Sequence, residues 1–400
     1  MGINTDELKS CAPLIPYVRE HYSKQIPFVR ENKSTVCAKC IWHEENTPSL
    51  ALFANGTYKC FGCGEHGDII TLVRRMENLQ FKEACKLIGD NVGYEVTIEE
   101  PDPLAEAYKD TLNEHAKRYM NNLQNNKEAI EYLKSRGITK ETAEKFMLGL
   151  TDEDEYKYRS DMGGISGKIS FPILEHKKIN PKCLGMAYRD IHGKMPKYIN
   201  DHNQDGREGQ NPRLCGIFVK GNMLYGLPFA YDEIRERNCI IIVEGYFDVI
   251  SLHQSDIKNS VGIMGTSLTD AQITTVSRLT DNVILFLDSD KAGRNAMLKS
   301  ISALYKAGLN VSICLIEGGL DPADLCKSLN FSWNKVYNKI KDNTKQGINF
   351  ILDAATEKYE SLVTVERQNV INKVMPIINE VKNPELREMY RTMLLKKLDL

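Results

Sequence analysis

The sequence predicts an α/β fold, mixed α+β over the whole chain, built around a parallel sheet flanked by helices. Four unbroken apolar runs of about five residues each occupy 239–243, 260–264, 283–287 and 311–316. Such runs are typical of strands buried on both faces of a parallel sheet, and helical segments fill the gaps between them. Because the carboxyl ends of parallel strands open on one crevice, the residues that follow the runs are expected to be neighbours in space.

The residues that follow these runs include a set of acids. Glu244 follows the first run, Asp288 and Asp290 follow the third, and Asp321 and Asp324 lie in the loop after the fourth. A concentration of carboxylates is costly unless it is neutralised, and hard divalent cations are the ions that oxygen ligands hold. The order and spacing of these acids favour a site for one to three ions, Mg²⁺ or Mn²⁺, over a set of ordinary soluble loop residues.

The composition is ordinary for a soluble globular protein, with 42% apolar and 26% charged residues among 400 and a formal net charge of −2. This length suits two or three domains. No apolar run is long enough to span a membrane and the N-terminus lacks a signal-peptide pattern, which predicts a cytoplasmic protein with no membrane partner. Seven of the eleven cysteines are isolated and are expected to be buried thiols: Cys11, Cys85, Cys183, Cys215, Cys239, Cys314 and Cys326.

The other four cysteines cluster between residues 37 and 64 and predict one structural zinc ion. Cys60 and Cys63 form one close pair. The second pair is either Cys37 with Cys40, which makes a four-cysteine ribbon, or Cys40 with His43, which makes a set of three cysteines and a histidine. A chance gathering of reduced thiols is the alternative, and the two short-range pairs disfavour it.

Between the two pairs, residues 50–60 (LALFANGTYKC) predict a β-hairpin that brings the pairs together. Asn55 and Gly56 are typical of a type I′ turn. Apolar residues at helical spacing over 68–90 predict a helical segment packed on the ribbon. Two prolines and a run of acids at 99–102 then predict a linker.

A basic segment lies between residues 168 and 220. It carries ten lysines and arginines against five acids, an excess of five in a chain whose formal total is −2. Phosphate backbones attract such surfaces through counterion release, and the alternative is a solvated loop face. Residues 163–170 (GGISGKIS) do not form a Walker phosphate-binding loop, because Met162 stands where glycine is needed and Ile169 where serine or threonine is needed.

Three groups of motifs resemble the DnaG-type DNA primases of bacteria and phages, over roughly residues 37 to 395. Cys40-Ile-Trp-His43, ENTPS at 45–49 and CFGCG at 60–64 resemble the family's CHC2-type zinc-binding domain. A second group resembles its RNA polymerase domain: GKISFPIL (167–174), LGMAYRD (184–190), MPKYIN (195–200) and FVKGNMLYGL (218–227). A third resembles its Toprim core: IIIVEGYFDVISL (240–252), GIMGTSLTDAQ (262–272), ILFLDSDKAGRNA (284–296) and GGLDPADL (318–325).

The resemblance implies a role for each matching site residue. It implies that Cys37 is uninvolved and that the zinc ligands are Cys40, His43, Cys60 and Cys63. It implies that Glu244 is the general base and that the divalent-metal site comprises Glu244, Asp248, Asp288, Asp290 and Asp321. Ala323 replaces the usual second acid of the family's Asp-Pro-Asp motif, so either the adjacent Asp324 or a water is expected to take that position.

The resemblance also implies the nucleic-acid contacts. Template or triphosphate contacts are expected from Lys168, which stands where the family usually has arginine, and from Arg189, Lys197 and Lys220. Lys291 and Arg294 either bind triphosphate or offset local negative charge. In the zinc module, four aromatic side chains either stack on unpaired bases or form a small core around the ion: Trp42, Phe53, Tyr58 and Phe61.

The function that these features predict is synthesis of short RNA primers on a single-stranded DNA template, by metal-dependent nucleotidyl transfer from ribonucleoside triphosphates. The product is an RNA/DNA hybrid, and a replicative helicase is a further candidate partner. The alternatives are a Toprim nuclease or topoisomerase-like enzyme, and a non-catalytic zinc-containing DNA-binding module.

These assignments divide the chain into five parts. They are a zinc-binding domain at 1–98, a linker at 99–110, a basic subdomain at 111–235, a Toprim subdomain at 236–328 and a small helical bundle at 329–400. After Leu325, apolar residues at spacings of three and four predict only helices. A separate helicase-binding domain, which many family members carry, is expected to be absent, replaced by a contact elsewhere, or removed.

Overall fold

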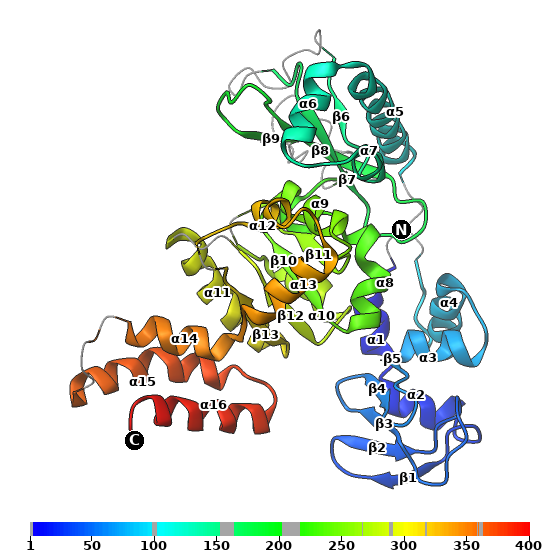
Figure 1. The fold of residues 1–400 in the computed structure, drawn as a ribbon. Coiled ribbons are helices and arrows are strands. Elements are labelled where there is room, and N and C mark those ends of the chain that lie inside the picture. The colour runs from blue at the N-terminus through cyan, green and yellow to red at the C-terminus, as the bar shows by residue number, and fades with distance from the viewer. Residues whose placement is uncertain are drawn as a thin grey trace, which may run out of the picture. The chain divides into compact units, whose positions relative to one another are not determined.

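The computed structural model describes residues 3–97, 102–152, 164–201, 217–265, 267–287, 291–316, 318–357, 359 and 363–400, with only the helical backbone for 291–293, 295 and 296. The chain divides into two compact units, Met1–Asp102 and Pro103–Leu400 (Figure 1). Each unit has hydrophobic clusters of its own. None of the described helices is long and apolar enough to cross a membrane.

The N-terminal unit is an antiparallel sheet whose five strands follow chain order, with two helices before it and two after it. The strands are β1 (Phe28–Glu31), β2 (Thr35–Ala38), β3 (Leu50–Phe53), β4 (Thr57–Cys60) and β5 (His66–Asp68). The helices are α1 (Thr5–Cys11), α2 (Leu14–His21), α3 (Ile69–Met76) and α4 (Phe81–Val92). They bury their apolar faces with the inner side chains of β2, β3 and β4 in one core.

Two local predictions in this unit need correction. The hairpin of β3 and β4 is confirmed, but its turn is not type I′, because only Gly56 has a positive φ. Gly56 N–H donates to Phe53 O, so Ala54, Asn55 and Gly56 form a three-residue loop that ends in a left-handed glycine. The predicted helical segment at 68–90 is two helices, since Asn78 adopts a positive φ that interrupts the helix.

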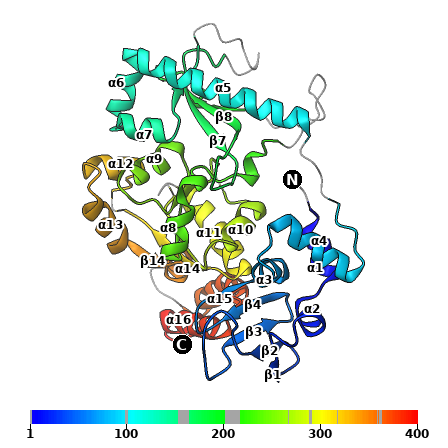
Figure 2. The ribbon, with the colours of Figure 1, turned by 90° about the vertical axis from the view of Figure 1, so that its right-hand side faces the viewer.

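The C-terminal unit begins with three helices and a small antiparallel sheet. The helices are α5 (Pro103–Asn125), α6 (Lys127–Ser135) and α7 (Lys140–Lys145), and the strands are β6 (Gly149–Leu150), β7 (Ile169–Leu174), β8 (Cys183–Arg189) and β9 (Tyr198–Asn200). Helix α5 lies across this sheet (Figure 2). The predicted linker at 99–110 therefore extends too far, because Pro103 is the first residue of a helix, a position that suits its fixed φ.

The central sheet has the order β11-β10-β12-β13-β14. Its first four strands are parallel, as predicted: β10 (Ile240–Val243), β11 (Ser260–Gly262), β12 (Asn282–Leu285) and β13 (Asn310–Cys314). Ile240 and Ile242 pack into one core cluster and Ile241 and Val243 into another, which is why the run is apolar without alternation. The surrounding helices are α8 (Leu227–Arg237), α9 (Tyr246–Gln254), α10 (Asp270–Ser277), α11 (Lys291–Ala307) and α12 (Pro322–Ser328).

The residues after Leu325 are not only helical. Helices α13 (Trp333–Asp342), α14 (Gly347–Thr356), α15 (Thr364–Asn379) and α16 (Pro384–Lys397) are present, and the last three pack on one another (Figure 1). The fifth strand, β14 (Thr344–Gln346), was not predicted and pairs antiparallel with β13. Its sequence is polar, like that of a loop. Polar and charged residues are nevertheless common in edge strands, and β14 lies at the edge of the sheet.

The prediction that the isolated cysteines are buried holds for Cys85, Cys183, Cys314 and Cys326. It is wrong for Cys11, which is exposed near the C-terminal end of a short surface helix, and Cys239 is half-buried. Cys215 lies outside the described residues.

Candidate metal centres and nucleic-acid interface

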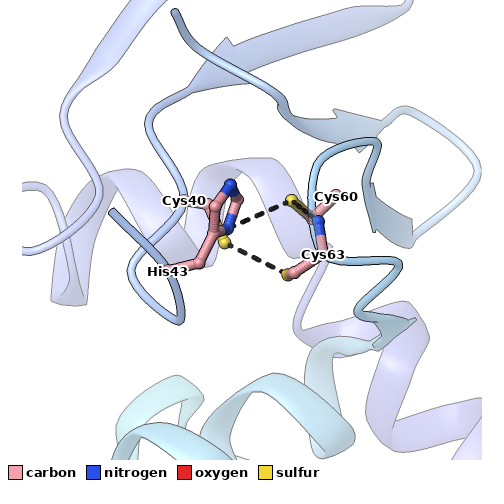
Figure 3. A group of neighbouring side chains, drawn as sticks. All are labelled: Cys40, His43, Cys60 and Cys63. Atoms are coloured by element: carbon pink, nitrogen blue, oxygen red, sulfur yellow. Dashed lines mark hydrogen bonds between the residues drawn. The ribbon is translucent and has the colours of Figure 1, made fainter. Parts of the chain in front are cut away.

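Three sulfurs and one imidazole converge in the N-terminal unit. Cys40 and His43 lie in the loop after β2, and Cys60 and Cys63 lie at the end of β4 and in the following turn (Figure 3). One ligand atom from each of these side chains lies within 4.8 Å of all the others. The Sγ atoms of Cys40 and Cys63 are 3.8 Å apart, as are His43 Nδ1 and Cys60 Sγ. Two sulfurs about 2.3 Å from a tetrahedral ion lie about 3.8 Å apart, so this donor set fits zinc in both chemistry and size.

Cys37 is not part of this group. It lies within β2, where it is paired with Ala51 of β3, and is half-buried. The hairpin therefore brings Cys60 and Cys63 to the Cys40 and His43 pair. This is the set that the family resemblance implies, whereas the spacing by itself left the choice of pair open.

Glu45, the first residue of the ENTPS motif, was not among the predicted site residues and supports this group. Its Oε1 accepts hydrogen bonds from the backbone N–H groups of Cys40 at 2.7 Å and Ser49 at 2.9 Å. Its Oε2 lies 3.1 Å from His43 Nε2, which leaves Nδ1 facing Cys60. Desolvation raises the pKa of Glu45, but the hydrogen bonds from Ser49 and Cys40 outweigh it and bring the pKa down to about 2. An ionised carboxylate behind a ligating imidazole fixes the orientation of the ring.

The four aromatic residues of this module divide into buried and exposed groups. Tyr58 is only 1% exposed and belongs to the core, and Trp42 stacks on it with ring centroids 5.4 Å apart. Phe53 is half-buried. Phe61, in contrast, is 69% exposed and has the ammonium of Lys59 5.9 Å from its ring centroid.

The described acids lie at the carboxyl edge of the parallel sheet. Glu244 directly follows β10, and Asp321 is the N-cap of α12, where its Oδ1 accepts the N–H of Asp324 at 2.7 Å. Leu287, the last residue described before Asp288, lies at the same edge, because β12 pairs parallel with β10 and Phe286 N–H donates to Ile242 O. Asp248 is buried in the first turn of α9, and the side chain of Asp324 is exposed.

Asp288 and Asp290, the predicted catalytic acids, and the side chain of Lys291 lie outside the described residues. Within the described part of the chain, the cysteine and histidine group is the only set of three or more His, Cys, Asp or Glu side chains close enough together to hold a metal ion. Glu244, Asp248, Asp321 and Asp324 do not form such a set by themselves.

The basic side chains range from exposed to buried. Lys197 and Arg294 are exposed, and Arg294 Nη1 lies 3.4 Å from Glu357 Oε1. Lys220 is half-buried at the start of a short 3₁₀ turn, and this burial lowers its pKa. Arg189 is 6% exposed, and its Nη1 donates to the hydroxyl of Tyr198 at 2.5 Å. Its guanidinium carbon lies 4.8 Å from the ring centroid of Tyr198 and 5.1 Å from that of Phe247.

Lys168 is also buried, at 9% exposure, and its Nζ lies 2.6 Å from Asp190 Oδ2. The second oxygen of Asp190 accepts the N–H groups of His192 at 2.9 Å and Lys194 at 3.0 Å. Desolvation raises the pKa of Asp190, but the Lys168 hydrogen bond and these backbone bonds lower it below its usual range. Lys168, for which a template contact is expected, thus forms an ion pair within the protein, and this pair anchors the loop after β8.

Two protein-family models match the chain, CHC2 zinc finger over residues 6–103 and Toprim-like over residues 241–326. The DNA primase of Borreliella burgdorferi is 30% identical over 406 aligned residues, which cover 90% of this chain and 73% of that protein. The chain belongs to the DnaG-type DNA primase family. The DNA primase of Clostridium acetobutylicum is also 30% identical, and the match covers 88% of this chain but only 61% of that protein.

Solved primase structures share the fold. The zinc-binding and RNA polymerase domains of the Aquifex aeolicus primase match the whole chain at 25% identity, with a TM-score of 0.61 and 98% of that structure covered. A DnaG primase catalytic domain bound to single-stranded DNA matches 73% of this chain at 22% identity, also with a TM-score of 0.61, and covers 96% of that domain. The sequence predicted a zinc-binding domain and a Toprim fold on one chain, and the primase family combines these two folds.

Breaking the Lys168 ion pair is expected to destabilise the C-terminal unit. Lys168→Met leaves the buried Asp190 carboxylate without its cation, which should lower the free energy of unfolding by about 3 to 5 kcal/mol. The control is Lys178→Met, because the Lys178 and Asp232 pair has the same 2.6 Å distance but side chains that are 60% and 75% exposed. It should change stability by less than about 1 kcal/mol. Urea unfolding followed by circular dichroism measures both, and equal effects would contradict a structural role for the buried pair.

Proposed function

We propose that this chain is a DNA primase that makes short RNA primers on single-stranded DNA from ribonucleoside triphosphates. The observation that carries the proposal is that the chain belongs to the primase family. In its parallel sheet, the strand that ends before Glu244 pairs with the strand that precedes Asp288 in the sequence. Support for the template comes from the similar catalytic domain that was solved with single-stranded DNA.

In the proposed reaction, a 3′-hydroxyl attacks the α-phosphate of a triphosphate, the new O–P bond forms, and pyrophosphate leaves. Glu244 would accept the proton of the hydroxyl. Asp288, Asp290 and Asp321 would hold Mg²⁺ or Mn²⁺, which when bound stabilises the attacking and departing oxygens. The exposed Lys197 and the half-buried Lys220 would hold the anionic strand and triphosphate, and positioning of this kind supplies much of the acceleration.

We infer further that zinc is held by Cys40, His43, Cys60 and Cys63 and that the N-terminal unit binds the template. The convergence of these four ligands and the orientation of His43 by Glu45 support the zinc assignment. The exposed ring of Phe61 supports the template contact, because an exposed aromatic face next to a lysine suits an unpaired base and its phosphate.

A primer-synthesis assay tests the proposal directly. The chain is incubated with labelled ribonucleotides, Mg²⁺ or Mn²⁺ and single-stranded DNA, and the products are resolved by length. We expect short labelled RNA that depends on template and on the divalent ion. Cleaved template in place of RNA would assign a Toprim nuclease, and binding without either product would assign a non-catalytic module.

Removing the exposed ring of Phe61 is expected to weaken template binding. Phe61→Ala should cost about 1 to 3 kcal/mol of binding free energy, because one base loses its stacking partner. Fluorescence anisotropy with a labelled single-stranded oligonucleotide measures this loss. Phe81→Ala is the control, since Phe81 is 41% exposed on α4 of the same unit and should leave the affinity unchanged. A similar loss in both variants would argue against a specific stacking site.

A further inference from the structure

One buried carboxylate holds the peptide that follows Glu244. Asp248 is 8% exposed, and its Oδ2 accepts the N–H of Gly245 at 2.8 Å. That N–H belongs to the peptide group that joins Glu244 to Gly245. The carbonyl of the same peptide accepts the N–H of Met264 at 3.0 Å. The peptide directly after the candidate general base is therefore held on both sides.

The same carboxylate reaches a second loop of the site. Its Oδ1 accepts the N–H of Ala323 at 3.4 Å. Ala323 lies in the first turn of α12, two residues after Asp321, which is the N-cap of that helix. A single side chain on α9 thus joins the loops that carry two candidate active-site acids far apart in the sequence.

The identity of residue 245 agrees with this close approach. A Cβ atom at Gly245 would lie 2.8 Å from Asp248 Oδ2, closer than carbon and oxygen atoms pack. Glycine therefore permits the loop after β10 to sit against the carboxylate of Asp248.

We propose that Asp248 is a positioning residue of the primase site, which orients Glu244 and Asp321 through their backbones and is not a ligand of the catalytic ions. This inference rests on the proposed function and differs from the metal role that the family resemblance implies for this residue. Both carboxylate oxygens face backbone N–H donors, which is the arrangement of a support for other catalytic groups.

The test compares Asp248→Asn with Asp288→Ala, a variant of a proposed metal ligand. An asparagine has the same shape but only one acceptor oxygen, so it can keep one of the two backbone bonds. We expect Asp248→Asn to lower kcat for primer synthesis by about 10- to 100-fold. Its Kd for Mn²⁺, measured by electron paramagnetic resonance, should rise much less than the Kd of Asp288→Ala, because the ligands themselves remain. Asp288→Ala should weaken Mn²⁺ binding strongly.

Hydrogen exchange by mass spectrometry gives a readout that is independent of activity. In Asp248→Asn the peptides that contain Gly245 and Ala323 should exchange faster, with an unchanged thermal midpoint for the N-terminal unit. A loss of Mn²⁺ affinity as large as that of Asp288→Ala would make Asp248 a ligand and overturn the proposal, as would a kcat within twofold of the parent. If the parent makes no primers, the proposed function fails by itself, and Mn²⁺ affinity and exchange still decide the role of Asp248.

Discussion

Replacement of His43 by alanine is expected to release zinc and unfold the sheet of the N-terminal unit. A structural zinc site contributes on the order of 10 kcal/mol to folding, which is comparable to the whole stability of a small domain. The strands β2 and β4 that lead to the ligands are only four residues long, so little else fixes their ends. Zinc content, measured by colorimetric titration after denaturation, should fall below one ion per chain, and circular dichroism should show lost structure.

The control for this experiment is Cys37→Ser. Cys37 lies on β2 outside the ligand group, so its replacement should leave one zinc ion per chain and the fold intact. Retained zinc in His43→Ala together with lost zinc in Cys37→Ser would show that the ion uses four cysteines, and the assignment of His43 would be wrong.

Replacement of Asp288 by alanine is expected to reduce primer synthesis by more than about 100-fold, since even groups that only support a metal ligand contribute about 10- to 100-fold. Removing a ligand leaves the phosphate oxygens without part of their charge neutralisation in the transition state. The readout is the rate of labelled primer formation at saturating Mg²⁺, with zinc content measured to show that the N-terminal unit is unaffected.

Asp281 offers a matched control for Asp288. It directly precedes β12 and is exposed at the amino end of the strand, whereas Asp288 follows the carboxyl end. Asp281→Ala should leave primer synthesis within about twofold of the parent, because ligands gather only at the carboxyl edge of a parallel sheet. A normal primer yield from Asp288→Ala would end the assignment of this residue to catalysis.

Several features of the molecule follow from local sequence patterns. The run at 240–243 is apolar at every position, and this is the signature of a strand buried on two faces, which β10 is. The close pair Cys60 and Cys63 indicates zinc because two thiols in one tight turn can face one ion. Such patterns depend on the residue and its near neighbours, so they can be read without knowing the fold.

Other features depend on partners that are distant in the chain. The family resemblance implies template or triphosphate contacts for Lys168 and Arg189, which both lie in the basic segment. In the structure both are buried: Lys168 pairs with Asp190, and the Arg189 guanidinium lies against the rings of Tyr198 and Phe247. Strand β14 was missed because its polar sequence is stabilised by pairing with β13. A charge count cannot distinguish a solvated lysine from a buried one, since burial is a property of the packed structure.

The sequence by itself determined the fold class, the primase family and the residue types of both candidate metal sites, because strand patterns, ligand spacing and short motifs are local. Ligand spacing left Cys37 and His43 as alternatives and the resemblance favoured His43, but only the tertiary structure brings His43 and not Cys37 next to the other three side chains. Only the tertiary structure, too, places Glu45 against His43 and lets Asp248 join two loops. These choices are set by distances of a few ångströms between segments far apart in the chain, which no local pattern contains.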